Sequence, residues 1–161
     1  EYLHSPQPQS IIHRDLKPQN IILNASKVAK IADFGLSKLL KDKDNKNILG
    51  LSEQNMPINL SSEDLTNIVG TKRYMSPELA KQMKYNQKID IWSIGVIFSE
   101  LFEGKRYNSD FYWKKTPIDI QNIINQFMLR EGPDNRLSAK EIIVLLQQIK
   151  TRYKNKKCWC F

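Results

Sequence analysis

The sequence predicts a mainly α-helical domain that begins with a few short β-strands. Two observations support this fold class. Near the N-terminus, apolar runs too short for helices alternate with polar residues. From about residue 76 onward, apolar residues recur at the spacing of helices that bury one face. The length of 161 residues and the 40% of hydrophobic residues suit one domain with its own core.

Three apolar runs are expected to form the strands, at residues 11–12, 21–23 and 28–31. The polar residues 24–27 predict a turn between the second and the third. The runs flank two polar segments, residues 13–20 and the segment that begins at Asp33. We therefore expect the strands to hold these segments on adjacent, rigid edges.

Two helices are expected next. Ser76 before Pro77 indicates an N-cap with proline at the first helical position, and this short helix should run to about Met83. Residues 89–103 are apolar on nearly every face. A helix of this kind is buried.

Two further helices follow. Thr116 and Pro117 repeat the cap pattern before an apolar stripe, and Gly132-Pro133 should end that helix. The stripe consists of Ile120, Ile123, Ile124, Phe127 and Met128. Ser138 and Glu141 form a capping-box pattern before the last helix. Its apolar face should contain Ile142, Leu145, Leu146 and Ile149.

The composition limits the classes of function. The net charge of +8 comes from dispersed lysines and arginines without a basic stripe interleaved with aromatic residues, so nucleic-acid binding is not expected. No apolar run is long enough for a membrane span. The two cysteines lie at the extreme C-terminus and form no disulfide framework, which favours the cytoplasm or the nucleus.

Two motifs carry chemistry: the octapeptide HRDLKPQN at residues 13–20, and Asp33-Phe34-Gly35. A carboxylate such as Asp15 can accept the hydrogen bond of a substrate hydroxyl. Oxygen ligands such as those of Asn20 and Asp33 are the kind that Mg²⁺ prefers. The motifs GTKRYMSPE at 70–78 and DIWSIG at 90–95 follow in order.

These four motifs resemble those of the eukaryotic protein kinase family, of the Ser/Thr type, over nearly the whole chain. The resemblance implies the C-terminal lobe of a kinase, a helical bundle whose small β-strands carry the catalytic and metal-binding loops. It also implies ATP and Mg²⁺ as cofactors and a protein substrate with a Ser or Thr acceptor. Residues 1–153 would form the partial kinase domain, with an activation segment at 33–78 and a basic, Cys-containing tail at 154–161.

Nothing before His13 matches the Gly-rich loop, strand lysine and helix glutamate of the family's N-terminal lobe. We therefore expect the N-terminal lobe to be absent from residues 1–161, and these residues alone to have little or no kinase activity. Within the activation segment, residues 41–60 are polar and rich in Asn and Lys. They are expected to be either a functional loop or a neutral low-complexity insertion.

The resemblance assigns the catalytic roles. Asp15 is the base or substrate-orienting carboxylate, and Lys17 places its ammonium near the transferred phosphoryl group. Asn20 and Asp33 bind the ATP-bound metal. Lys17 and Thr71 are also typical of Ser/Thr kinases rather than tyrosine kinases.

It also assigns structural and regulatory roles. His13 packs under Phe34 of the triplet that Gly35 completes; the alternative is a general base. Arg14 pairs with an activation-segment phosphate. Among positions far apart in the chain, Glu78 pairs with Arg136. Asp90 ties the buried helix to the catalytic-loop backbone; the alternative is a simple carboxylate at a helix N-terminus.

The resemblance makes Thr66 the leading candidate for an activating phosphosite, because its place five residues before Thr71 is similar to that of activating threonines in the kinases of the translation initiation factor 2 alpha subunit. Ser61, Ser62 and Thr71 are the other candidates. A phosphate there would add negative charge that Arg14 can pair with. The alternative is a solvated turn formed with Glu63 and Asp64.

Residues 70–78 and 85–100 resemble most the kinases of the translation initiation factor 2 alpha subunit. Only about fourteen residues, 104–117, separate the buried helix from the next, where kinases hold a further helix. An unassigned Ser/Thr kinase therefore remains an alternative. So does a non-catalytic lobe or pseudokinase that acts as a binding module.

The last four residues, Cys158 to Phe161, have the length and the terminal Phe of a prenylation box, with basic residues before them. Trp159 and Cys160 are not aliphatic, unlike the usual box. A lipid anchor and an unmodified, frayed helix end both remain open.

Overall fold

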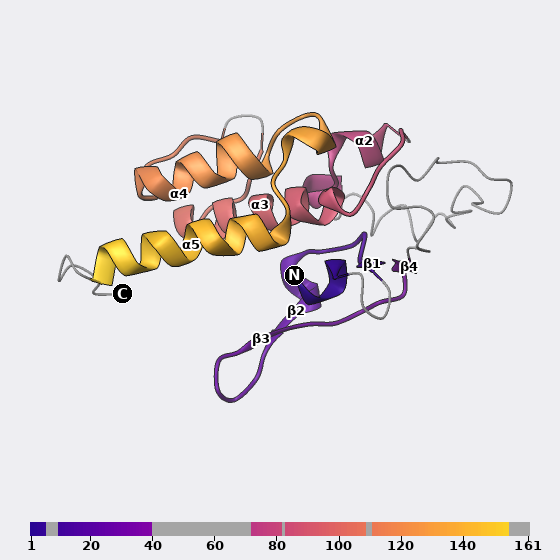
Figure 1. The fold of residues 1–161 in the computed structure, drawn as a ribbon, viewed down its shortest axis with the longest axis horizontal. Helices are drawn as coiled ribbons and strands as arrows, with labels where there is room; N and C mark the ends of the chain where they lie inside the picture. The colour runs from indigo at the N-terminus through magenta and orange to yellow at the C-terminus, as the bar shows by residue number, and fades with distance from the viewer. Residues whose placement is uncertain (6–9, 40–71, 82, 109–110, 155–161) are drawn as a thin grey trace, which may run out of the picture.

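The computed structural model describes residues 1–5, 10–39, 72–81, 83–108 and 111–154. In this part of the chain, small strands lie at one end of the molecule and long helices at the other (Figure 1). The strands are β1 (Ile11–Ile12), β2 (Ile21–Leu23), β3 (Ala29–Ile31) and β4 (Lys38–Leu39). The α-helices are α2 (Pro77–Ala80), α3 (Lys88–Glu103), α4 (Ile118–Ile123) and α5 (Ala139–Lys154). The predicted helix-rich fold with few small strands is confirmed.

The strands form two antiparallel pairs. β1 pairs with β4, with Ile11 opposite Leu39, and β2 pairs with β3, with Ile21 opposite Ile31. The β2–β3 hairpin turns at residues 24–27, as the sequence predicts. There the Asn24 side-chain oxygen accepts a hydrogen bond from Val28 N at 2.8 Å, and Lys27 takes a left-handed φ of 58°.

α2 is shorter than predicted, since it ends at Ala80 and not near Met83. Ser76 lies at its N-cap, but the hydroxyl makes no cap hydrogen bond and is buried without a partner among the described residues. The Ser76 carbonyl instead accepts the N–H of Ala80 at 2.9 Å, so only its backbone begins the helix.

α3 is buried along most of its length, as its apolar sequence predicts. One of its apolar residues differs: Leu101 is 71% exposed. Gly95 lies where α3 meets the chain after α4, and a Cβ there would be 2.9 Å from Leu129 Cδ2. It would also be 3.0 Å from Met128 Cβ, so the close approach of these two segments favours glycine. Gly104, with φ 68°, ends the helix.

The segment after residue 116 differs from the single helix predicted up to residue 132. α4 ends at Ile123 and continues as one π-helical turn, η5 (Ile124–Met128). Thr116 does not cap α4, because Pro117 is the N-cap and the Thr116 hydroxyl binds Glu103. The predicted stripe still faces inward, with Ile120, Ile123, Ile124 and Met128 buried.

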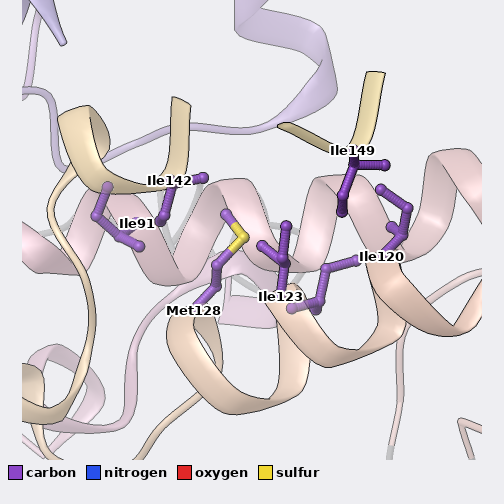
Figure 2. Close-up of a cluster of buried hydrophobic side chains, with 7 residues drawn as sticks. Ile91, Ile120, Ile123, Met128, Ile142 and Ile149 are labelled. Carbon is purple, nitrogen blue, oxygen red and sulfur yellow. The ribbon is translucent and has the colours of Figure 1, made fainter. Parts of the chain in front are cut away.

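The main core lies between α3, α4, η5 and α5 (Figure 2). It consists of Ile91, Ile120, Ile123, Ile124, Met128, Ile142 and Ile149. The predicted capping box begins α5, because Glu141 Oε2 accepts the Ser138 N–H at 2.7 Å while Ser138 Oγ accepts the Glu141 N–H at 3.3 Å.

Candidate active site

Asp15 lies in the loop between β1 and β2, and only 6% of it is exposed. Its Oδ2 accepts hydrogen bonds from Lys17 Nζ at 2.7 Å and from Asn20 Nδ2 at 3.2 Å. Its Oδ1 is buried and has no hydrogen-bond partner within the described residues. A buried acceptor without a partner is rare in folded proteins, so the site retains a position for a donor from outside.

Asn20 and Asp33 come together because the β2–β3 pairing continues past Ile21 and Ile31. The N–H of Ala32 donates to the carbonyl of Asn20 at 2.9 Å, so Asp33 is one residue from this contact. The Asn20 amide nitrogen also donates to the Asp15 carbonyl at 2.8 Å, which leaves the amide oxygen as the ligand atom. The Asp33 side chain is exposed.

These donors fit Mg²⁺, which prefers oxygen ligands and is usually held by one or two carboxylates together with substrate phosphates. Among the described residues, no three His, Cys, Asp or Glu side chains gather as a possible metal site. Asn20 and Asp33 are the residues that would hold the ion, as the motifs predict. Asp33 also has a left-handed φ of 60°, a conformation that is uncommon for non-glycine residues and that occurs in turns and at functional sites.

His13 is buried and links the two loops. Its Nε2 is 3.0 Å from the carbonyl oxygen of Ala32, and its ring centroid is 5.0 Å from that of Phe34. The Asp15 N–H points to its Nδ1 at 3.4 Å. Both ring nitrogens therefore have structural partners, which supports a positioning role and not a catalytic one.

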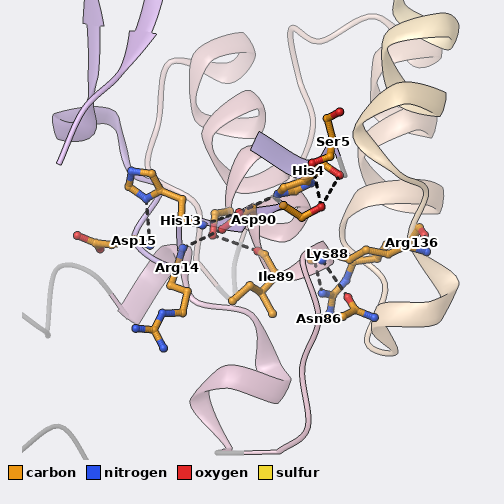
Figure 3. Close-up of polar contacts among 12 residues, drawn as sticks. His4, Ser5, His13, Arg14, Asp15, Asn86, Lys88, Ile89, Asp90 and Arg136 are labelled. Carbon is orange, nitrogen blue, oxygen red and sulfur yellow. Dashed lines mark hydrogen bonds and ion pairs between the residues drawn. The ribbon is translucent and has the colours of Figure 1, made fainter. Parts of the chain in front are cut away.

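Asp90, at the start of α3, lies beside His13 and Arg14 of the catalytic loop (Figure 3). Its Oδ2 accepts the N–H of His13 at 2.9 Å and its Oδ1 accepts the N–H of Arg14 at 3.0 Å. The predicted tie between the buried helix and the catalytic-loop backbone is therefore present. His4, which the sequence analysis did not single out, adds a third contact at 2.9 Å to Oδ2.

Arg14 has a left-handed φ of 69°. Its Nε donates to the carbonyl of Leu36, and its Nη1 donates to the Tyr85 hydroxyl at 3.2 Å. The side chain thus joins the catalytic loop to the start of the activation segment. Thr66, Thr71, Ser61 and Ser62 lie outside the described residues, so the phosphate partner of Arg14 stays a prediction.

Arg136 and Glu78 form the predicted ion pair. Arg136 Nη1 and Nη2 reach the two Glu78 oxygens at 2.6 and 2.8 Å, and the Arg136 side chain is fully buried. The other guanidinium hydrogens bind main-chain oxygens, including that of Arg130 at 2.7 Å. The guanidinium also lies 5.0 Å from the Trp92 ring. The pair is thus fully hydrogen-bonded and joins α2 to the chain before α5.

Two carboxylates of α3 were missed in the sequence. Glu100 accepts hydrogen bonds from the Tyr74 hydroxyl at 2.7 Å and from Tyr107 N at 3.0 Å. Burial, and then the bond to Glu100, raises the pKa of Tyr74. The sequence could have indicated these two residues only because Glu100 and Glu103 lie about one turn apart in a mostly apolar helix.

The second is Glu103, which is 4% exposed. Its oxygens accept the N–H groups of Lys114, Lys115 and Thr116 and the Thr116 hydroxyl, the last at 2.6 Å. Burial by itself raises the pKa of Glu103, but these hydrogen bonds, first that of the Thr116 hydroxyl, outweigh it and lower the pKa from 4.5 to about 2. The carboxylate is therefore ionised at neutral pH and anchors the segment before α4.

Comparisons with known proteins identify the family of the chain. Residues 1–156 match the family model of the protein kinase domain. A "Probable serine/threonine-protein kinase" of Dictyostelium discoideum is 31% identical over 163 residues, covering 92% of this chain and 16% of that protein. The "Serine/threonine-protein kinase TIO" of Arabidopsis thaliana is 38% identical over 124 residues, covering 77% of this chain and 8% of that protein.

A third relative is the "Cysteine-rich receptor-like protein kinase 10" of Arabidopsis thaliana. It is 42% identical over 111 residues, covering 69% of this chain and 14% of that protein. The chain thus spans less than a fifth of the length of these curated relatives. Within the described residues, no helix has the length and apolar character needed to cross a membrane. From its motifs, its site geometry and a family match over residues 1–156, the chain belongs to the protein kinase domain family.

Proposed function

We propose that the protein transfers the γ-phosphoryl group of ATP to Ser or Thr hydroxyls of a protein substrate. The observation that carries this proposal is the Asp15 carboxylate. One oxygen is held by Lys17 and Asn20, while the other is buried without a partner among the described residues. A substrate hydroxyl that donates to this second oxygen would satisfy it and would be oriented for attack.

The neighbouring residues supply the other parts of the reaction. Bound Mg²⁺ would bridge the ATP phosphates and neutralise their charge. Asn20 and Asp33 would hold that ion from two loops that the Ala32–Asn20 hydrogen bond keeps together. The Lys17 ammonium, 2.7 Å from Asp15, would stabilise charge on the transferred group.

The test compares wild-type protein with Asp15→Asn, both isolated at full natural length from cells that express the gene. Transfer of labelled γ-phosphate from ATP and Mg²⁺ to Ser/Thr peptides should fall roughly 100-fold or more, the scale of a general base. An equal rate in the variant would remove Asp15 from this role. Phosphate on tyrosine peptides alone would contradict the Ser/Thr specificity.

A non-catalytic binding module, such as a pseudokinase that engages partners, is the second proposal. The retained Asp15, Asn20 and Asp33 favour the enzyme. Absence of ATP-dependent phosphorylation by the wild-type, full-length protein, together with unchanged partner binding in Asp15→Asn, would favour the module.

Three finer proposals follow from the sequence. Residues 1–161 taken alone would correspond to the C-terminal lobe and would be inactive, which a phosphorylation assay of this chain tests directly. The initiation-factor subfamily would be supported by phosphorylation of the initiation factor 2 alpha subunit in preference to other Ser/Thr substrates. Thr66 remains the leading phosphosite, and phosphate found only on Ser61 or Ser62 in peptide mapping would reject it.

A further inference from the structure

The short 3-10 helix η4 (Lys72–Tyr74) lies beside the catalytic loop. Tyr74 is 7% exposed and belongs to one buried cluster with Leu16 of that loop and with two residues of α3. Leu16 directly follows Asp15, and Lys72 is two residues before Tyr74. The start of η4 therefore lies near the carboxylate that would orient the substrate hydroxyl.

The backbone of η4 is fixed by three hydrogen bonds. The Tyr74 carbonyl accepts the Ser93 hydroxyl at 2.7 Å, and the Tyr74 hydroxyl donates to Glu100 at 2.7 Å. The Lys72 carbonyl accepts the N–H of Met75 at 3.2 Å. Because the backbone is already ordered, a bound peptide would spend little binding free energy on ordering it.

Two neighbouring cations lie beside carboxylates, whereas Lys72 does not. Lys17 Nζ is 2.7 Å from Asp15 Oδ2, and Arg73 Nη1 is 3.7 Å from Glu100 Oε1. Lys72 is exposed and forms no ion pair with any other residue that the structure describes. Its charge is therefore available to a substrate.

We propose that Lys72 is a specificity-determining residue that recognises an acidic side chain of the acceptor peptide. The inference rests on the proposed phosphoryl transfer, which supplies the peptide as substrate. A Glu or Asp near the acceptor would face Lys72 while the acceptor hydroxyl donates to Asp15. Opposite charge favours this peptide, and a lysine at the same place is disfavoured.

The length of the peptide limits where the acidic residue lies. An extended chain rises about 3.3 Å per residue, so a few residues span the distance between neighbouring segments of one site. Lys72 and Asp15 are each within two residues of the same buried cluster. We therefore expect the acidic residue within about four positions of the acceptor.

The experiment uses the full-length protein, isolated from cells that express the gene, and neutral Ser peptides in which one Glu is moved through these positions. Relative to Gln at the same place, Glu should raise kcat/KM about threefold at one or two adjacent positions, the scale of an exposed charge pair. The preference should disappear in Lys72→Ala and at about 1 M salt.

Lys72→Glu is the sharpest variant, because it should reverse the preference, so that Lys at the same peptide position becomes better than Gln. Since Lys72 is exposed, neither change should unfold the protein. The matched control is Lys81→Ala, which removes an exposed lysine that follows α2 and should keep the preference for Glu.

A second measurement does not need transfer: fluorescence anisotropy of the labelled Glu and Gln peptides with Ala in place of the acceptor Ser. Transfer without a Glu preference, or a preference unchanged in Lys72→Glu, would overturn the role of Lys72 and leave the phosphoryl transfer intact. Equal loss in Lys81→Ala would overturn it too, as unspecific charge attraction. Glu-dependent binding that Lys72→Glu reverses, without transfer to any peptide, would instead overturn the proposed enzyme and retain the recognition. Neither transfer nor binding would overturn both.

Discussion

The helical region and the hairpin of the catalytic region expose their apolar residues very differently. Between α3 and α5, side chains such as Ile124 and Met128 are completely buried. In the β2–β3 hairpin, by contrast, Ile22 is 56% and Leu23 63% exposed. The hairpin therefore gains little from hydrophobic burial within the described residues, although it carries Asn20 and Asp33 at its base.

This difference in burial indicates which contacts position the candidate active site. The catalytic loop is held by polar contacts to the helical region, above all by the Asp90 carboxylate, which accepts the N–H groups of His13 and Arg14. The helical core provides the rigid base for Asp90, because Ile89 and Ile91 on either side are each 1% exposed. A change in the helical region should therefore affect the site, whereas a change on the exposed face of the hairpin should affect stability little.

The largest expected effect on stability is that of Arg136→Ala. The variant would leave the Glu78 carboxylate buried and without its partner, which costs about 3–5 kcal/mol in the free energy of unfolding. Urea unfolding measures this. The matched control is Arg152→Ala, which breaks an ion pair whose arginine is 57% exposed and should cost less than about 1 kcal/mol. Equal costs would mean that the Glu78–Arg136 pair is solvated in solution.

Truncating one isoleucine in each region tests the comparison directly. Ile124→Ala in η5 removes a side chain that is 0% exposed, and it should cost about 2–5 kcal/mol. Ile22→Ala in β2 removes one that is 56% exposed and should change stability by no more than about 0.5 kcal/mol. A large loss in Ile22→Ala would reveal that another part of the protein covers the hairpin.

Asp90→Asn should weaken the contact between the catalytic loop and the helical region. An amide has one acceptor oxygen, and its NH₂ group would face the N–H of His13 or Arg14, so the loss should be roughly 1.5–3 kcal/mol. Hydrogen exchange at these two amides should become faster than in wild type. Asp134→Asn, at an exposed aspartate, is the control. Unchanged exchange at both amides in Asp90→Asn would show that the loop does not depend on this carboxylate.

The smallest expected effect is that of Glu103→Gln, about 1–2 kcal/mol at neutral pH, because the amide oxygen keeps part of the hydrogen bonding. The pKa of Glu103 is lower in the folded chain, about 2, than its ordinary value of 4.5. Its carboxylate therefore stabilises the fold fully above about pH 4.5, and this stabilisation is lost as the pH falls toward 2.

The melting temperatures of wild type and Glu103→Gln should accordingly differ most at neutral pH and converge between pH 4.5 and about 2. Glu131→Gln, at an exposed glutamate, should show no such convergence. A difference that stays constant with pH would contradict the proposed anchor.

The sequence by itself determined the features that rest on local patterns. The stripe from Ile120 to Met128 predicted a buried helical face, and Ser138 with Glu141 predicted the start of α5. The order of residues in 13–20 and 33–35 predicted a site with Asp15, Asn20 and Asp33, and family resemblance supplied the distant pairing of Glu78 with Arg136.

Tertiary structure decided whatever depends on partners far away in the chain. Glu103 is an anchor only because the segment 114–116 folds back to it. The Thr116 hydroxyl binds that carboxylate and therefore makes no capping hydrogen bond to α4. Leu101 belongs to an apolar helix, yet it is exposed, because no described element covers that side of α3. His4 reaches Asp90 across 86 positions of sequence. Local periodicity cannot encode such contacts, since their energies arise only when packing brings the two segments together.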